Sequence, residues 1–234
     1  MSAGPNGERQ HLIIDADDTL WENNIYFERA FDAFVEFLDH SSLSKTEIQD
    51  VLDEIELANN KIHGYGSLNF ARNMHECYER LVEREIQPDA AATIMGFAEG
   101  IMNHPVQLMD GVEQTLQELA MRHDLVLFTK GHPEEQKLKV DRSGVGVYFG
   151  RTEIVREKDE PAYRKLIADC NFDATRSWMI GNSPKSDINP ALQAGLNAVF
   201  VPHERTWHLE RTDLGSGAGK LLVIERFSDL LQHF

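Results

Sequence analysis

Three carboxylates directly follow an apolar run near the start of the chain. Residues 12–20 run Leu-Ile-Ile-Asp-Ala-Asp-Asp-Thr-Leu, which places acids at Asp15, Asp17 and Asp18. Such an apolar run is typical of a buried strand of a parallel sheet, and open α/β sheets bind ligands at the C-terminal ends of their strands. Since like charges packed this closely are costly unless a cation lies between them, the pattern indicates a site for a metal ion and a phosphoryl group. The alternative for this stretch alone is structural, with Asp17 or Asp18 capping the next helix and Asp15 closing a turn.

Three later segments supply donors and ligands that this strand end lacks. Thr129 ends a predicted strand, and its hydroxyl can donate to a phosphate oxygen. Lys158 follows another strand and can neutralise both a carboxylate and a phosphate, while residues 181–187 follow a third and offer oxygen ligands for a hard cation. Taken singly, Thr129 could simply finish its strand, Lys158 could be a surface lysine, and Asp187 could cap the next helix. Their common placement at strand ends favours one shared site.

Alternating strands and helices must position these residues. After residue 106 the pattern predicts strands at 125–129, 151–155, 178–180, 198–201 and 221–224. Helical patterns lie between them, including 133–141 and 188–194, and a short helix ends the chain. Such alternation predicts an α/β fold with a Rossmann-like parallel sheet core and helices on both faces.

A helical segment interrupts this alternation after the first strand. Apolar residues recur at spacings of four, three and four, which places them on one helix face: Phe27, Phe31, Phe34 and Leu38. Ser44 and Glu47 form a capping box, and Asp89 can cap a fourth helix. We therefore expect an all-helical domain inserted into the catalytic core, with residues 22–105 in the insertion and residues 1–21 and 106–234 in the core.

Composition limits the partners of the chain. Its 234 residues hold 23 lysines and arginines against 39 acids, for a net charge of −16, which argues against a nucleic acid or an anionic membrane surface as the main partner. No apolar stretch approaches the roughly 20 residues of a membrane span. Cys77 and Cys170 lack metal-type spacing, so we expect buried thiols in a reducing cytoplasm. The sequence leaves the oligomeric state open.

The ordered set of strand-end residues resembles the four motifs of the haloacid dehalogenase superfamily, specifically its phosphatases. Residues 15–20 are similar to the first motif, Thr129 to the second, Lys158 to the third, and residues 181–187 to the fourth. The helical insertion resembles the cap domain of one subclass. The resemblance extends over residues 13–227.

The resemblance implies a role for each of four residues. Asp15 would be the nucleophile that forms an aspartyl-phosphate, and Asp17 would be the general acid and then the general base. Thr129 and Lys158 would bind the transferring phosphoryl group, and Lys158 would also orient Asp15.

The resemblance also implies a bound Mg²⁺ ion. Its ligands would be the Asp15 carboxylate, the Asp17 backbone carbonyl and the fourth-motif loop, with Asn182 and Asp187 as candidates. Many members carry an acid where this chain has Asn182, so either metal affinity falls or Asp187 takes the direct position. Lys130 stands where asparagine is common, and either adds positive charge near the phosphate or points into solvent.

The function implied is a magnesium-dependent phosphatase of a small phosphorylated metabolite, of nucleotide or sugar phosphate type. One alternative is a carbon–halogen hydrolase of the same superfamily, although such enzymes lack the acid at Asp17 and need no metal. Another is a non-catalytic binding protein in which Asn182 weakens the metal site. Within the insertion, Tyr65 lies between two glycines and is a candidate to bind substrate, unless this loop merely joins two helices.

Overall fold

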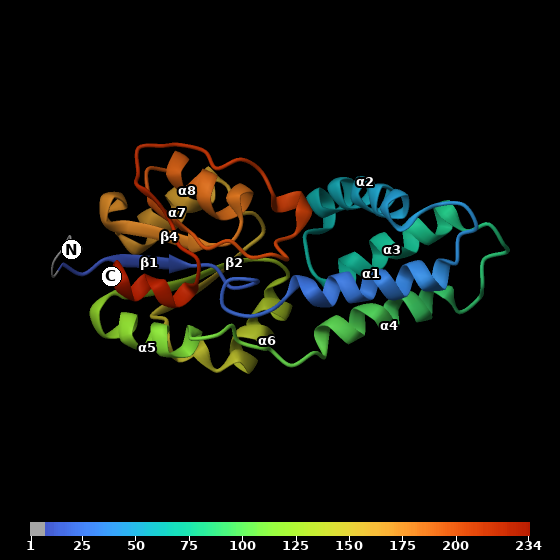
Figure 1. Cartoon of the computed structure of the whole chain (residues 1–234), viewed down its shortest axis with the longest axis horizontal. Helices are drawn as coiled ribbons and strands as arrows, with labels where there is room; N and C mark the ends of the chain where they lie inside the picture. The colour runs from blue at the N-terminus through green and yellow to red at the C-terminus, as the bar shows by residue number, and fades with distance from the viewer. Residues whose placement is uncertain (1–7) are drawn as a thin grey trace. The chain divides into compact units, whose positions relative to one another are not determined.

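The computed structural model describes residues 8–234, which form two compact units (Figure 1). The first unit comprises the described residues up to Glu22 together with Val106–Phe234, and the second comprises Asn23–Pro105. Each unit has its own apolar core.

The first unit is built on a six-stranded sheet with strand order β3-β2-β1-β4-β5-β6. All paired strands are parallel. The strands are β1 (His11–Ile14), β2 (Asp124–Lys130), β3 (Arg151–Val155), β4 (Ser177–Gly181), β5 (Asn197–Phe200) and β6 (Leu221–Val223). This is the order of a doubly wound sheet, in which the strand order reverses beside the first strand and opens a ligand site there.

Helices of the first unit connect these strands. The α-helices are α5 (Val112–Arg122), α6 (Pro133–Ser143), α7 (Glu160–Cys170) and α8 (Asn189–Gln193). Shorter turns are η1 (Val145–Tyr148), η2 (Ala174–Arg176), η3 (Pro184–Ile188), η4 (His208–Glu210) and η5 (Phe227–Gln232).

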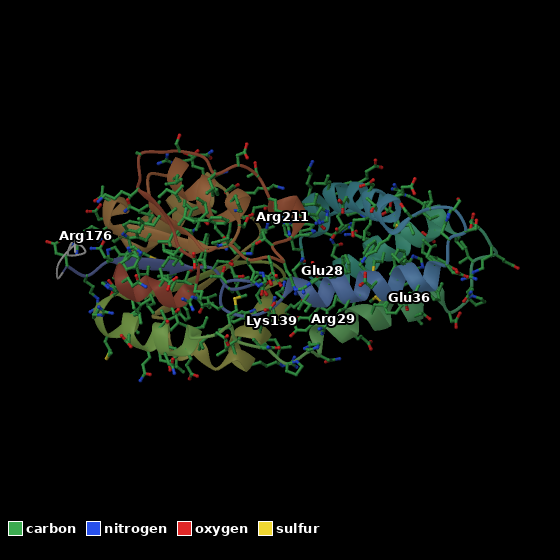
Figure 2. All side chains as sticks on the ribbon, viewed as in Figure 1. Glu28, Arg29, Glu36, Lys139, Arg176 and Arg211 are labelled. Carbon is green, nitrogen blue, oxygen red and sulfur yellow. The ribbon has the colours of Figure 1, made fainter. Side chains whose placement is uncertain are left out.

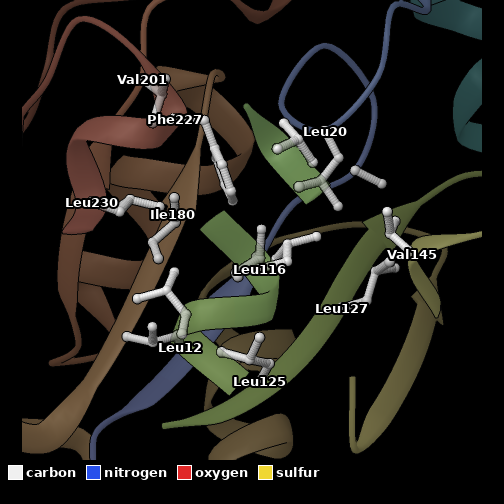
Figure 3. Close-up of a cluster of buried hydrophobic side chains, with 14 of the residues drawn as sticks. Leu12, Leu20, Leu116, Leu125, Leu127, Val145, Ile180, Val201, Phe227 and Leu230 are labelled. Atoms are coloured by element: carbon white, nitrogen blue, oxygen red, sulfur yellow. The ribbon is translucent and has the colours of Figure 1, made fainter. Parts of the chain in front are cut away.

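Alternate residues of β1 contribute to two apolar layers. Leu12 belongs to the cluster that contains Leu116 of α5 and residues of η5, and Figure 3 shows this cluster between the sheet and those helices. Ile13 belongs to a separate cluster with Tyr163 of α7. Because successive strand residues point to opposite faces, these two clusters cover the two sides of the sheet. The predicted α/β fold with a Rossmann-like core is confirmed.

The second unit consists of four helices around its own core. They are α1 (Asn24–Leu38), α2 (Lys45–His63), α3 (Ser67–Leu81) and α4 (Ala90–Met102). Each helix buries apolar residues in the common cluster, for example Phe34, Leu52, Met74 and Ile94. The predicted capping box starts α2, since Glu47 N donates to Ser44 Oγ at 3.3 Å and Ser44 N donates to Glu47 Oε2 at 2.8 Å. Asp89 precedes α4 but makes no side-chain capping bond.

Two predicted helices differ from those in the structure. The helix expected over residues 188–194 is divided into the π-helical turn η3 and the short helix α8. The terminal helix is the 3-10 helix η5. Within residues 8–234, every helix is too short or too polar to cross a membrane.

Candidate active site

The parallel register brings several strand ends to one edge of the sheet. Ile14, the last residue of β1, pairs with Leu127 of β2 and with Ile180 of β4. The backbone N–H of Asp15 still donates to the Ile180 carbonyl at 2.9 Å, so the carboxylate emerges directly from the ladder. Residues that follow these three strands therefore lie around the C-terminal end of β1.

An ammonium joins two carboxylates at this edge. Lys158 Nζ donates to Asp15 Oδ1 and, at 2.8 Å, to Asp187 Oδ1. The Lys158 and Asp187 side chains are only 2% and 1% exposed. Burial by itself lowers the pKa of the Lys158 ammonium, but the attraction of the two carboxylates outweighs burial and raises that pKa above its usual value.

Asp187 is held in place by the loop that follows β4. Its Oδ2 accepts from the Ser183 backbone N–H at 2.9 Å, while Ser183 Oγ accepts from the Ser186 N–H at the same distance. Burial, and then the nearby Asp15 carboxylate, raise the pKa of Asp187 to about 7, although Lys158 acts in the opposite direction. The site thus carries more negative charge than Lys158 alone neutralises.

Thr19 connects Asp15 with Asn182. Thr19 Oγ1 lies 2.8 Å from Asp15 Oδ2 and 3.2 Å from Asn182 Oδ1, so its one hydroxyl serves two acceptors. The Asn182 amide is oriented by its other end, because its Nδ2 donates to Thr206 Oγ1 at 2.9 Å. The amide oxygen is consequently directed to the same side as the Asp15 carboxylate.

These oxygens form a donor set that suits Mg²⁺. The carboxylates of Asp15 and Asp187 share Lys158, and the Asn182 amide oxygen shares Thr19 with Asp15. Magnesium prefers hard oxygen ligands from carboxylates and carbonyls, and the two carboxylates of Asp15 and Asp187 share the single ammonium of Lys158. The chemistry of the Asp15, Asn182 and Asp187 oxygens therefore fits the ion, while the role of the Asp17 carbonyl stays a prediction.

A second group of possible metal ligands includes two acids that follow Asp15 and Asp17 in the sequence, but none of the residues predicted to bind Mg²⁺. Ligand atoms of Asp18, Glu22 and His203 fall within 4.8 Å of one another. His203 Nε2 lies 3.7 Å from Glu22 Oε2, and its Nδ1 accepts from the Arg205 backbone N–H at 3.3 Å. The sequence did not reveal this cluster, because about 180 residues separate His203 from the two acids.

The Asp17 carboxylate has a separate set of partners. Lys139 of α6, labelled in Figure 2, places its Nζ 2.7 Å from Asp17 Oδ1 and 2.6 Å from Oδ2. Trp21 Nε1 donates to Oδ1 at 2.8 Å, and Gln136 Nε2 donates to Oδ2 at 2.9 Å. No motif in the sequence indicates a role for these three residues. A spacing of three on α6 puts Gln136 and Lys139 on one helix face, which is the only local signal for this arrangement.

Thr129 and Lys130, at the end of β2, contact different partners. Thr129 Oγ1 accepts from Gln136 Nε2 at 2.6 Å, so the predicted phosphate-binding hydroxyl shares a donor with Asp17. Lys130 Nζ donates to Glu210 Oε1 at 2.8 Å and to Ser186 Oγ at 3.0 Å. With a largely buried side chain, Lys130 does not extend into solvent.

Glu210 is the buried counter-ion of Lys130. Its Oε2 accepts from Ser183 Oγ at 2.6 Å, which connects η4 to the fourth-motif loop. Burial by itself raises the pKa of Glu210, but the Lys130 ammonium and the donated hydrogen bonds outweigh burial and lower it. Glu210 lies in a segment without strong periodicity, so no local pattern in the sequence indicates its role.

Tyr65 belongs to the second unit, between α2 and α3. The flanking Gly64 and Gly66 have φ of 77° and 127°, in the region that favours glycine. Asn69 Nδ2 donates to the Gly64 carbonyl at 2.7 Å and to Asn60 Oδ1 at 2.8 Å, which anchors this loop to both helices. The Tyr65 side chain is half-buried.

Comparisons with known proteins identify structural relatives across almost the whole chain. The chain is similar to a haloacid dehalogenase-like family hydrolase from Xanthomonas campestris, at 26% identity and a TM-score of 0.79 over 96% of this chain and 95% of that chain. It has the fold of a 2-haloacid dehalogenase from Pseudomonas syringae, at 20% identity and a TM-score of 0.63 over 96% and 97% of the two chains. It also has the fold of a predicted phosphoglycolate phosphatase from Haemophilus somnus, at 15% identity and a TM-score of 0.66 over 97% and 98%.

No curated protein matches the sequence. A family model described as haloacid dehalogenase-like hydrolase matches residues 10–195, which is more than half of the chain. This range contains Asp15, Thr129, Lys158 and Asp187, the residues that converge at the sheet edge. The protein therefore belongs to the haloacid dehalogenase-like hydrolase family.

Proposed function

We propose that the protein is a magnesium-dependent phosphatase that hydrolyses a small phosphorylated metabolite through an aspartyl-phosphate intermediate. The observation that carries the proposal is the pair of carboxylates after β1, which occupy two different environments. Asp15 contacts Lys158 inside a buried cluster, whereas Asp17 contacts Lys139. This difference supports the assignment of attack on phosphorus to Asp15 and of proton transfer to Asp17.

The proposed reaction has two steps. An Asp15 oxygen attacks phosphorus, so that an Asp15–phosphorus bond forms while the ester phosphorus–oxygen bond breaks. Asp17 gives a proton to the leaving oxygen. Water then attacks phosphorus, Asp17 takes a proton from that water, and the Asp15–phosphorus bond breaks. Both carboxyl groups return to their initial state, and the products are an alcohol and phosphate.

Other groups of the site support these steps. The Thr129 hydroxyl and the Lys158 ammonium would bind the phosphoryl oxygens, and Thr19 and Lys158 orient the Asp15 carboxylate. When bound, Mg²⁺ would supply positive charge against the phosphoryl group; its ligands would be Asp15, the Asp17 carbonyl, Asn182 and Asp187. Several catalytic groups are required, because enzymes accelerate phosphate-monoester hydrolysis by up to about 10²¹-fold.

The alternatives fit the residues less well. Carbon–halogen hydrolases of the same superfamily lack an acid at the position of Asp17 and need no metal. A non-catalytic protein would have no use for an attacking carboxylate, a proton-transfer carboxylate and a buried ammonium held together. The Asp15, Asp17 and Lys158 set therefore favours phosphoryl transfer.

The test is phosphate release from a panel of small phosphate esters, with Mg²⁺ and with a chelator. We expect metal-dependent release that Asp15→Asn abolishes. Halide release from 2-haloacids is measured in parallel. Halide release without phosphate release would establish the dehalogenase alternative, and release of neither product by folded protein would favour the binding-protein alternative.

We infer that the substrate is small and soluble rather than a nucleic acid, because the net charge of −16 disfavours a polyanionic partner. Two free cysteines suit a reducing compartment, so we place the reaction in the cytoplasm.

Tyr65 is proposed to contribute to substrate selection. Tyr65→Ala should change KM for some esters of the panel and not for others, and equal effects on all esters would contradict this role.

A further inference from the structure

We propose that Lys139 is a positioning residue for Asp17, which it holds together with Gln136 beside the phosphate-binding hydroxyl of Thr129. The inference rests on the proposed phosphatase function and deepens it. It assigns a role to one face of α6 that the motifs of the chain did not indicate.

The Asp17 carboxylate is fixed at both oxygens. Lys139 Nζ contacts Oδ1 at 2.7 Å and Oδ2 at 2.6 Å, while Trp21 Nε1 donates to Oδ1 and Gln136 Nε2 donates to Oδ2. The side chains of Lys139 and Asp17 are 19% and 22% exposed, so this ion pair is better shielded from solvent than an ordinary surface pair. Three donors from two segments determine both the position and the plane of the carboxylate.

Gln136 links this carboxylate to the phosphate-binding strand end. Its Nε2 lies 2.9 Å from Asp17 Oδ2, 2.6 Å from Thr129 Oγ1 and 2.9 Å from the Lys130 carbonyl. A Cβ placed on Gly131 would lie 3.0 Å from Gln136 Cγ, and Gly131 has a φ of 150°. Glycine at this position therefore allows the Gln136 side chain to lie against the backbone after β2.

The Gln136 amide is bound only through its nitrogen. Its Oε1 is buried and has no hydrogen-bond partner among the described residues. The orientation of the Gln136 amide thus serves the hydrogen bonds from its Nε2 to Asp17 and Thr129.

Positioning matters because of the proton that Asp17 transfers. General acid–base catalysis requires the donor within about 2.6–3.2 Å of the reacting oxygen. A poor leaving group such as an alkoxide depends on this proton, whereas p-nitrophenolate departs with little need for it. If Lys139 acts through Asp17, its loss must selectively slow the formation of the aspartyl-phosphate from esters with poor leaving groups. A merely structural ion pair would affect all esters alike.

The experiment measures kcat and KM for Lys139→Met with p-nitrophenyl phosphate, phenyl phosphate and a simple alkyl phosphate at saturating Mg²⁺. We expect kcat/KM for the alkyl ester to fall by about 10²-fold or more, and kcat/KM for the nitrophenyl ester to fall by less than about 3-fold. The ratio kcat/KM is compared because it reports formation of the aspartyl-phosphate, whereas kcat also includes its hydrolysis, in which Asp17 acts as the base for every ester. Lys139→Arg should recover part of the loss. Lys137→Met, at an exposed lysine of the same helix, is the matched control and should resemble the wild type.

A double-mutant cycle with phenyl phosphate completes the test. Once Asp17→Asn has removed the proton-transfer group, adding Lys139→Met should change the rate by less than about 3-fold. Equal losses of kcat/KM for all three esters in Lys139→Met, or a full additional loss in the Asp17→Asn background, would overturn the positioning role while leaving the phosphatase function intact. Failure of the wild type to release phosphate from any ester would instead overturn the proposed function, and this inference with it.

Discussion

The Asp187 carboxylate lies directly against the α-carbon of Gly181. A Cβ placed on Gly181 would lie 2.3 Å from Asp187 Oδ2 and 2.5 Å from its Cγ. Gly181 is the last residue of β4, so the absence of a side chain there allows the following loop to fold back onto the strand end. Glycine at this position is thus a requirement for the contact between Asp187 and Lys158.

Gly181→Ala should therefore displace Asp187. We expect phosphate release to fall by at least about 10-fold and the free energy of unfolding to fall by about 1–3 kcal/mol, because the added methyl group overpacks a buried site. Steady-state kinetics and urea unfolding measure the two effects. Gly150→Ala is the control, since its new Cβ would meet only the Leu125 carbonyl at 3.9 Å. Wild-type activity in Gly181→Ala would show that Asp187 need not occupy this position.

Thr19 offers a second test of the site. Its hydroxyl serves Asp15 Oδ2 and Asn182 Oδ1, and Thr19→Val removes it with little change of shape. Loss of a donor to a buried carboxylate costs about 1–3 kcal/mol, so we expect kcat to fall by about 10- to 100-fold and the Mg²⁺ concentration for half-maximal activity to rise. Thr115→Val is the matched control, because this buried threonine of α5 donates to the carbonyl of Gly111, which directly precedes the helix. Equal losses in both variants would indicate a general effect on stability.

The sheet and its strand-end residues could be predicted because their signals are local. Apolar runs give the strands, alternation with helices gives the parallel sheet, and a parallel sheet brings its strand ends to one edge. The fold class and the family are confirmed by the structure and by the family model. Asp15, Lys158 and Asp187 are indeed brought together, while their catalytic roles stay predictions.

The partners of Asp17 could not be predicted, because they are set by tertiary packing. Gln136 and Lys139 lie 119 and 122 residues from Asp17 in sequence, on a helix whose polar positions look like an ordinary solvated face. The same holds for Lys130, whose partner Glu210 is 80 residues away. Local patterns predict which residues share an edge, but they do not predict which polar groups pair across it.

The Lys130–Glu210 pair can be tested by removing its members singly and together. Glu210→Gln leaves a buried ammonium without its counter-ion, which typically costs about 3–5 kcal/mol of stability. We expect the double variant Glu210→Gln/Lys130→Met to recover most of this loss in urea unfolding. If Lys130 also binds the substrate phosphate, KM should stay raised in the double variant even though stability has recovered. A wild-type KM there would end the substrate-binding prediction for Lys130, and a double variant as unstable as Glu210→Gln would contradict the pairing.

Glu56 should make the stability of the helical unit depend on pH. Its side chain is buried on α2, and burial, followed by repulsion from Asp53, raises the pKa of its carboxyl from 4.5 to about 8. Between these values the native state retains a proton that the unfolded chain releases, so the free energy of unfolding falls as pH rises through this window and levels off above it. Glu56→Gln should flatten this slope and stabilise the protein by a few kcal/mol at about pH 9, as measured by urea unfolding or by hydrogen exchange of α2. Glu54→Gln, at an exposed neighbour, should keep the wild-type slope, and an unchanged slope in Glu56→Gln would show that Glu56 ionises as an ordinary carboxyl.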